Sequence, residues 1–262
     1  MKIDTAGPVR ILTLDRPEKL NALDSNAWIT LLSELRTAED EPSIRVVLLR
    51  SEGRAFSAGN DIKETNAFDS VARTKWYFLD LMVPTLAAMA TSRLPIVAEV
   101  QGLAYGAGME LLQFCDIVVA SDEAQFRLPE TGIGLWATVF LGSAAYTTSR
   151  RATQYLALTG EPMSSHDALA HSLISRVVGA EALTGEGERI ATLIAANGPR
   201  ATALTKKFAN HPIVTQSLPV VREALSVLID ETFSGPEGME GVASFIEKRD
   251  PSFADATNVH GR

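Results

Sequence analysis

The stretch QGLAYGAGMELLQFC, residues Gln101 to Cys115, decides the fold of this chain. It follows the apolar run Ile96–Val100, which predicts a buried strand. Its glycines at 102, 106 and 108 allow backbone conformations that are closed to other residues and let the chain approach a ligand closely. A helix from about Met109 to Phe114 is predicted to follow at once, so free backbone N–H groups lie beside a Gly-lined gap. Such a turn suits a developing negative charge on oxygen, and the carboxylate of Glu110 stands in the first helical turn.

Two other interpretations of this stretch remain open from its residues alone. A Gly-rich turn between a strand and a helix is common, and an acidic residue in the first turn often only complements the helix dipole. Gly106 and Gly108 after a strand, with Asp122 further on, are also similar to a dinucleotide-binding turn. The third glycine of that motif is missing because Leu111 stands in its place, and the space before Ile117 holds barely two helical turns. These departures disfavour nucleotide binding.

Strand and helix alternate through the first half of the chain. The runs Val9–Leu14 and Ile44–Leu49 predict strands, and the second is apolar enough for a sheet covered on both faces. Between them, apolar residues at helical spacing predict a helix capped by Asp24 or Ser25. The loop that follows, Ser51–Glu64, has a glycine at 59. By itself it is typical of an ordinary polar loop; the alternative is that Gly59 makes a tight turn that presents the N–H groups of Ala58 and Asn60 to a ligand.

The second half of the chain changes character beyond Thr138. Glu130 stands just before the flexible turn Gly132–Gly134, and after Thr138 the pattern is helical apart from a short strand over Leu173–Val178. Strands with helices early and helices late predict an α/β core followed by a helical region for packing or assembly. We therefore divide the chain into residues 1–195, the core with the site, and residues 196–262, the helical region.

The composition and the net charge limit the classes of function that this protein can have. The 262 residues are 46% hydrophobic and 21% charged, which is typical of a globular protein. A net charge of −8 disfavours nucleic acid as the main partner. The only cysteine, Cys115, lies in an apolar helix and indicates core packing and a reducing compartment. No secretory signal and no run long enough to span a bilayer is visible, so we expect a cytoplasmic protein without membrane contact.

No metal-ligand spacing is present among the histidines. They stand at positions 166, 171, 211 and 260, in helical or terminal segments away from the motifs above. A pattern such as His-Glu-x-x-His does not occur. We predict neither a metal nor a redox cofactor.

Several motifs occur together in one order. AFSAGNDIKE, GLAYGAGME and FRLPETGIG follow one another along the chain, flanked by RPEKLNAL at residues 16–23, LTGEPMSSHDA at 158–168 and SFIEKRDPSF at 244–253. In this order the chain resembles the enoyl-CoA hydratase/isomerase family, the crotonase superfamily. The resemblance implies the crotonase (ClpP/crotonase-like) α/β fold, a spiral of ββα units with a C-terminal helical trimerisation region. It also implies an acyl-CoA substrate and a homotrimer, or a hexamer made of two trimers.

The resemblance implies a role for each of four residues. Two backbone N–H groups would stabilise the enolate of the thioester, and by position they belong to Asn60 and Ala107. Two glutamates would flank the substrate's double bond, Glu110 mainly activating water and Glu130 exchanging the α-proton. Adding water across a conjugated double bond requires both a base and an acid. Keeping both carboxylates therefore favours hydration over isomerisation, for which members of the family generally use the second carboxylate alone.

The resemblance also implies contacts to coenzyme A, which enters as part of the substrate and not as a separate cofactor. They would come from the early loop, from the loop after residue 57 and from the last helix: Lys19, Ala58, Asn60, Ile62, Lys63, Phe245 and Lys248.

One segment departs from the family pattern. After Gly134 the family commonly has proline and glycines, whereas this chain has Leu135–Phe140, which places Trp136 and Phe140 where thin backbone is usual. Repacking, a reshaped acyl pocket or the loss of a water position would each follow from this bulk. We expect a hydratase that acts on a 2-enoyl-CoA. A Δ3,Δ2-enoyl-CoA isomerase, another acyl-CoA enzyme of the superfamily and a non-catalytic acyl-CoA-binding protein are the alternatives.

Overall fold

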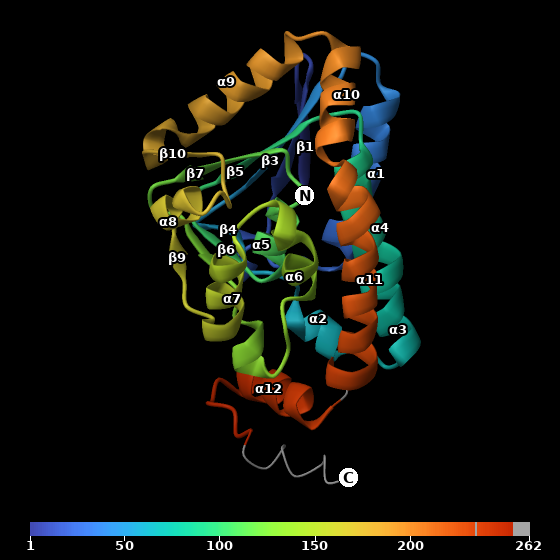
Figure 1. Ribbon diagram of the computed structural model, residues 1–262, viewed down its shortest axis with the longest axis vertical. Coiled ribbons are helices and arrows are strands. Elements are labelled where there is room, and N and C mark those ends of the chain that lie inside the picture. Colours follow the sequence, from blue (N-terminus) through green and yellow to red (C-terminus); the bar gives the residue numbers. More distant parts are fainter. Residues whose placement is uncertain (234, 254–262) are drawn as a thin grey trace.

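The computed structural model describes residues 1–233 and 235–253, and its strands form two sheets (Figure 1). The larger sheet has the spatial order β1 (Lys2–Ala6), β2 (Val9–Leu14), β3 (Val46–Ser51), β5 (Ile96–Val100), β7 (Ile117–Ser121) and β10 (Arg176–Val178). The smaller sheet has the order β4 (Ala55–Ser57), β6 (Leu103–Tyr105), β8 (Gln125–Arg127) and β9 (Met163–Ser164). Only β1 with β2 and β8 with β9 pair antiparallel; the other neighbours are parallel.

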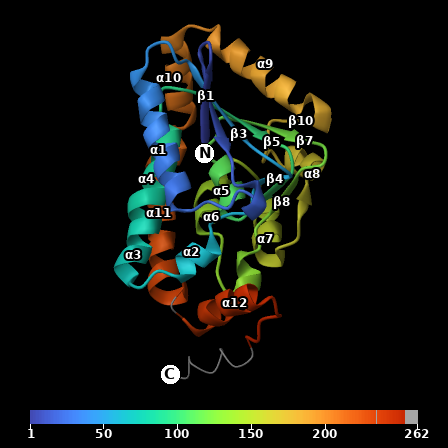
Figure 2. The same ribbon diagram turned by 180° about the vertical axis from the view of Figure 1, so that it is seen from behind.

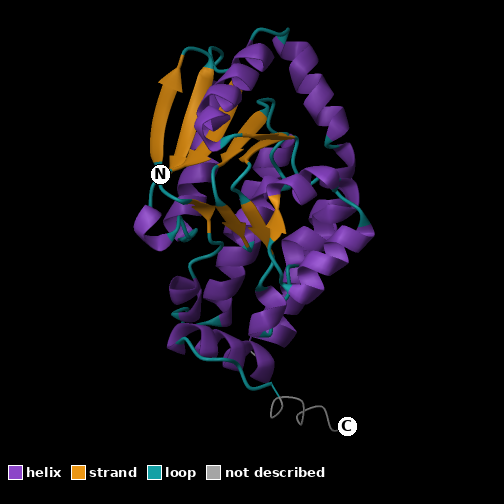
Figure 3. Ribbon diagram, turned by 90° about the vertical axis from the view of Figure 1, so that its left-hand side faces the viewer, coloured by secondary structure: helices purple, strands orange, loops and turns teal. Residues whose placement is uncertain are grey.

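The chain alternates between the two sheets. It passes from β3 to β4, from β5 to β6 and from β7 to β8, and a helical segment follows each passage. Each turn of the chain thus adds one strand to the larger sheet and one to the smaller sheet, which Figure 3 shows as separate groups of strands. This arrangement is the spiral of ββα units that the sequence predicted.

The α-helices surround these sheets (Figure 2). They are α1 (Ser25–Asp40), α2 (Ile62–Asn66), α3 (Val71–Lys75), α4 (Val83–Thr91), α5 (Ala107–Leu112), α6 (Thr138–Ser143), α7 (Arg150–Thr159), α8 (Ser165–Ala170), α9 (Leu183–Ala195), α10 (Pro199–Ala209), α11 (Leu218–Val227) and α12 (Pro236–Glu247). Short 3₁₀ or wide π turns join them: η1 (Pro17–Lys19), η2 (Trp76–Met82), η3 (Glu130–Ile133), η4 (Ala144–Tyr146), η5 (Ala180–Ala182), η6 (Ile213–Ser217) and η7 (Leu228–Phe233).

Helices cover both faces of the larger sheet. On one face, alternate residues of β2, β3 and β5 join the main core. On the other face, Ile11, Leu48 and Val97 lie in neighbouring strands and pack against Ala191 of α9. Because both faces are buried, β3 is apolar at successive positions, as the sequence indicated.

Several element boundaries differ from the predictions. The strand β3 starts at Val46, two residues later than expected, and α5 begins at Ala107, so the free N–H groups come earlier in the turn. Pro84 stands in the first turn of α4, directly after the π turn η2. The strand β1 and the smaller sheet were not predicted, because strands of two or three residues carry no readable periodicity.

Within residues 1–233 and 235–253, no single helix is long and apolar enough to cross a membrane. The bent pair Pro199–Ala209 and Ile213–Thr232 meets the same criteria of length and composition.

Candidate active site

The loop after β4 and the turn after β6 touch one another. Gly59 has φ +100°, and a Cβ atom at this position would lie 3.1 Å from the carbonyl oxygen of Tyr105 and 3.2 Å from the backbone nitrogen of Ala107. Only glycine allows this conformation and this approach. In the described part of the chain, the N–H groups of Asn60 and Ala107 donate to no backbone acceptor. Two backbone N–H groups without a backbone acceptor therefore stand on adjoining loops; that they bind a thioester oxygen, as the resemblance implied, stays a prediction.

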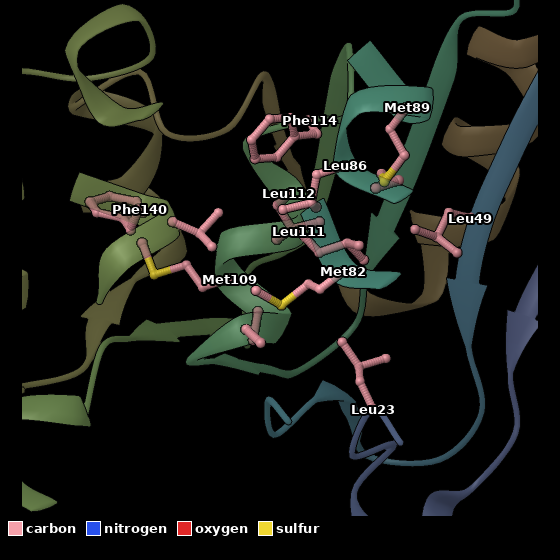
Figure 4. Close-up of a cluster of buried hydrophobic side chains, with 14 of the residues drawn as sticks. Leu23, Leu49, Met82, Leu86, Met89, Met109, Leu111, Leu112, Phe114 and Phe140 are labelled. Carbon is pink, nitrogen blue, oxygen red and sulfur yellow. The ribbon is translucent and has the colours of Figure 1, made fainter. Parts of the chain in front are cut away.

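The position of α5 depends on its N-cap. Gly106 has φ +51°, and its N–H donates to the carbonyl oxygen of Arg127 in β8 at 2.9 Å. Every residue of α5 is buried, and its side chains enter the main core, where Met109, Leu111 and Leu112 appear in Figure 4. A short helix anchored in this way holds the N–H of Ala107 rigidly.

Glu110 is a buried carboxylate with fixed partners. Glu110 is only 7% exposed to solvent. Its Oε1 accepts hydrogen bonds of 3.0 Å from the backbone N–H groups of both Val139 and Phe140. These donors belong to the first turn of α6, where free N–H groups favour a negative charge. Burial raises the pKa of Glu110 above its usual range, and the two N–H donors oppose that rise.

Glu130 has a different environment. It stands in η3, and its Oε2 is buried without a hydrogen-bond partner among the described residues. Its Oε1 lies 3.0 Å from the place where a Cβ on Gly106 would be, so this carboxyl packs directly against the turn before α5. Burial is the main cause that raises the pKa of Glu130, and the nearby charge of Glu110 raises it further.

The carboxyl groups of Glu110 and Glu130 together are expected to carry one proton near neutral pH. Glu110 receives two N–H donors that stabilise its anion, whereas Glu130 has a buried oxygen without a donor. Like charges close together in a buried site do not both ionise readily. Near neutral pH the arrangement therefore favours an ionised Glu110 beside a protonated Glu130.

The free N–H groups and both glutamates line one cavity of about 110 Å³. Ala58 and Ile62, expected near coenzyme A, also line it. The remainder of its wall is largely apolar and comes from η2, from the segment after Gly134 and from the C-terminal helices: Phe78, Met82, Ile133, Leu135, Trp136, Leu225 and Leu228. The C-terminal region therefore contributes to the wall of this cavity.

The other expected coenzyme A residues lie outside the wall of this cavity. Lys19 and Lys63 are exposed, and the ammonium of Lys19 stands 3.6 Å from a carboxylate oxygen of Asp61. Phe245 and Lys248 are on and just after α12, where Phe245 is 54% exposed. Their contact with coenzyme A stays a prediction.

The departure after Gly134 has two consequences in the structure. Leu135 and Trp136 line the cavity, as expected of bulky residues there. Phe140, in contrast, is fully buried in the main core and reaches the site only through its backbone N–H. The segment therefore narrows the cavity at Trp136 and also binds Glu110.

The sequence analysis missed the side chains that surround Asn60. Its Oδ1 accepts hydrogen bonds from the indole N–H of Trp28 at 3.2 Å and from the hydroxyl of Tyr77 at 3.0 Å. Trp28 is on α1 and Tyr77 on η2, and both are almost fully buried. Each has a polar atom on an otherwise apolar stripe, but the sequence gives no sign that the two meet at residue 60.

Three of the histidines and the cysteine do not line this cavity. His166, His171 and His211 are exposed, and His260 lies outside the described residues. Cys115 is half-buried against the core, and burial raises the pKa of its thiol. Among the described residues, no group of three or more His, Cys, Asp or Glu side chains is arranged to hold a metal ion.

Comparison with known proteins agrees with this geometry. The family model described as enoyl-CoA hydratase/isomerase matches residues 4–256. The chain belongs to the enoyl-CoA hydratase/isomerase family. It is 34% identical, over 93% of its length and 82% of the relative's, to the mitochondrial enoyl-CoA hydratase domain-containing protein 3 of Xenopus laevis. It is 32% identical to a probable enoyl-CoA hydratase of Mycobacterium leprae, with 96% of each chain covered.

Solved structures of family members establish the fold. The crystal structure of an enoyl-CoA hydratase/isomerase from Pseudoalteromonas atlantica matches this chain with a TM-score of 0.86 and 29% identity. The match covers 96% of this chain and 98% of the other. An enoyl-CoA hydratase from Mycobacterium avium subsp. paratuberculosis gives a TM-score of 0.83 at 27% identity, covering 96% and 97%. The chain has the crotonase fold, as the sequence resemblance implied.

Proposed function

We propose that this protein hydrates a 2-enoyl-CoA to the corresponding 3-hydroxyacyl-CoA. The observation that carries the proposal is the unequal environment of two glutamates on one cavity. Two N–H donors favour the anion of Glu110 against the effect of its burial, whereas burial and its neighbour's charge raise the pKa of Glu130, whose buried oxygen has no donor among the described residues. Hydration needs one base and one acid at the same time.

The proposed reaction uses each group once. Glu110 takes a proton from water, and the water oxygen forms a bond to the β-carbon of the enoyl thioester. The electrons of the double bond move toward the thioester, whose oxygen becomes an enolate held by the N–H groups of Asn60 and Ala107. Glu130 then delivers its proton to the α-carbon. The pair ends with the proton on Glu110, and exchange with solvent restores the starting state.

Isomerisation makes a different demand on the same residues. A 1,3-proton shift begins with removal of an α-proton, so Glu130 would have to be ionised before the reaction. The raised pKa of Glu130 opposes that state near neutral pH. Hydration is therefore the better-supported reaction, and isomerisation is one outcome of the test below.

The test compares two substrates and three variants. Crotonyl-CoA should lose its enoyl-thioester absorbance, and a 3-enoyl-CoA should show no comparable gain. Glu110→Gln and Glu130→Gln should each lower kcat by about 100-fold or more, the contribution typical of general acid or base catalysis. Glu99→Gln is the matched control, because Glu99 is equally buried but lies on the opposite face of the larger sheet, under α9.

The outcomes separate the candidate functions. Gain of absorbance from the 3-enoyl substrate alone would replace hydration by isomerisation. Tight acyl-CoA binding without turnover on either substrate would indicate a binding protein. Near-normal turnover of Glu110→Gln or Glu130→Gln would remove that residue from the mechanism.

The proposal extends to assembly and location. Exposed apolar side chains on α10, Leu204 at 43% and Phe208 at 69%, support contact between copies through the C-terminal region. We propose a homotrimer or a hexamer, which light scattering after size-exclusion chromatography tests; a monomer would contradict it. A cytoplasmic location stays a prediction, and the Xenopus laevis relative is named as mitochondrial.

A further inference from the structure

The side-chain amide of Asn60 has a fixed orientation. The indole nitrogen of Trp28 is only a hydrogen-bond donor, so the Asn60 atom that it faces at 3.2 Å must be the oxygen. The hydroxyl of Tyr77 has one proton and two acceptors, the carbonyl oxygen of Leu23 at 2.8 Å and the same Asn60 oxygen at 3.0 Å, and it lies 3.1 Å from the Trp28 nitrogen. The orientation of the amide therefore rests on the Trp28 donor. A flipped amide would place its NH₂ group against the Trp28 donor. The NH₂ group of Asn60 therefore points away from Trp28.

Among the residues that the structure describes, this NH₂ group has only a weak acceptor. Nδ2 lies 4.0 Å from the sulfur of Met82, and a thioether sulfur accepts hydrogen bonds poorly. Asn60 and Met82 both line the active-site cavity, whose neighbouring wall is apolar. A primary amide has two N–H donors, and because Asn60 is half-buried and lines the cavity these donors are open to a group bound there. A ligand oxygen in the cavity would satisfy them.

We propose that the acyl group of the natural substrate carries a neutral oxygen, a hydroxyl or a carbonyl, that accepts a hydrogen bond from Asn60 Nδ2. The inference rests on the proposed acyl-CoA function of this site. It goes further because it states the chemical class of the acyl chain.

The charge of the cavity selects a neutral oxygen. Glu110 and Glu130 line the same cavity, and an ionised Glu110 repels a second carboxylate. A hydroxyl or carbonyl oxygen accepts from an amide without adding charge. We therefore expect an acyl chain that ends in a carboxylate to be a poorer substrate than its hydroxyl or keto analogue.

The two donors of Asn60 limit where the oxygen can stand on the acyl chain. Asn60 supplies both the backbone N–H for the thioester oxygen and the side-chain amide. The two donors belong to one residue, so the acyl oxygen lies only a few bonds from the thioester. Trp136 and Leu228 also limit the space in the cavity, which favours a short chain.

Steady-state kinetics with matched substrates test the proposal. The pair is 2-hexenoyl-CoA and 5-hydroxy-2-hexenoyl-CoA, with 4-hydroxy-2-hexenoyl-CoA as a positional alternative. We expect kcat/KM to favour one hydroxylated substrate by about tenfold, the ratio that one satisfied hydrogen bond supplies. Equal kcat/KM values for all three substrates, with hydration intact, would overturn the inference and leave the proposed function standing.

Three variants test whether the preference for a hydroxylated substrate depends on the Asn60 amide: two substitutions of Asn60 and one of its neighbour in space, Met82. Asn60→Leu keeps the size and removes the donor, so the ratio should fall to about one. Asn60→Asp keeps an acceptor for Trp28 and Tyr77 but places an oxygen where the NH₂ was, so the ratio should also be lost. Met82→Leu is the matched control, because it removes the sulfur and leaves the donor, and it should retain the ratio. Retention of the preference in Asn60→Leu would assign it to another residue.

A binding measurement separates this inference from the proposed function. Hexanoyl-CoA and 5-hydroxyhexanoyl-CoA have no double bond and do not react, so calorimetry measures their affinities without turnover. A tighter Kd for the hydroxylated ligand, lost in Asn60→Leu, would support the inference even if neither enoyl substrate were hydrated. Equal Kd values for hexanoyl-CoA and for both its 4-hydroxy and 5-hydroxy derivatives would contradict it even if hydration were rapid.

Discussion

Replacing Glu130 by glutamine should make the folded protein less sensitive to alkaline pH while nearly abolishing turnover. Burial and the charge of Glu110 raise the pKa of Glu130 to about 8 from 4.5. A carboxyl whose pKa is raised on folding stabilises the folded state below its unfolded pKa, and this contribution is lost as the pH rises through the folded pKa. The wild-type free energy of unfolding should therefore fall between about pH 4.5 and about pH 8.

The magnitude follows from the linkage relation. Each pH unit below the folded pKa of about 8 corresponds to about 1.4 kcal/mol, so raising the pH from about 6 to about 9 should cost the wild type about 3 kcal/mol through this group. Glutamine does not titrate and loses nothing. Glu110 adds to the difference, because without a charged neighbour its own pKa is expected to be lower in the variant.

Urea denaturation at a series of pH values measures this difference. The quantity of interest is the free energy of unfolding of Glu130→Gln minus that of the wild type, which should increase between about pH 6 and about pH 9. Glu99→Gln is the control. Glu99 is 3% exposed, one of its oxygens lacks a partner among the described residues, and burial raises its pKa to about 7. This variant should reduce the pH sensitivity over a similar range without changing kcat.

Parallel pH curves for the wild type and Glu130→Gln would refute the reasoning. They would mean that Glu130 is ionised in the folded protein near neutral pH. Its role as the acid would then be wrong, and the base required for isomerisation would be available.

Three further predictions follow from the same geometry. The wild-type kcat/KM should decline at alkaline pH as Glu130 loses its proton. In Glu110→Gln the decline of the remaining activity should occur at lower pH, because the substitution removes the charge that raises the pKa of Glu130. A decline at the same pH in both proteins would show that the two carboxyls do not interact. Gly106→Ala should lower kcat and cost about 1–2 kcal/mol of stability, because φ is +51° and the new Cβ would stand 3.0 Å from Oε1 of Glu130; thermal unfolding and turnover check this, and a fully active variant would contradict the placement of that carboxyl. Trp136→Ala should enlarge the cavity and raise kcat/KM for a longer 2-enoyl-CoA relative to crotonyl-CoA by about tenfold; an unchanged ratio would place the end of the acyl chain elsewhere.

Local chemistry accounts for the parts of the site that the sequence predicted. Glycines at 59 and 106 have positive φ, and the conformation that they permit is what brings the two loops together. Glu110 follows the second glycine by a fixed number of residues, so its place in the first turn of α5 was readable as soon as the strand before it was recognised. The family resemblance added Glu130, which its own surroundings in the sequence would not have marked as functional.

Contacts between distant segments account for the parts that were not predicted. The order of strands in two sheets depends on which backbone groups find partners, and the three-residue strands β4, β6 and β8 have too few residues for a pattern. The amide of Asn60 is oriented by side chains from α1 and η2, 32 and 17 positions away along the chain.

The sequence by itself determined the buried strands, most helix positions, the two glycine turns and, through the resemblance, the family. These features depend on short-range periodicity and backbone freedom, which each segment carries alone. Only the tertiary structure decided the protonation of the two glutamates and the direction of the Asn60 amide. Both depend on burial and on donors from elsewhere in the chain: Val139 and Phe140 stabilise the anion of Glu110, no such donor reaches the buried oxygen of Glu130 within the described residues, and Trp28 fixes the oxygen of Asn60.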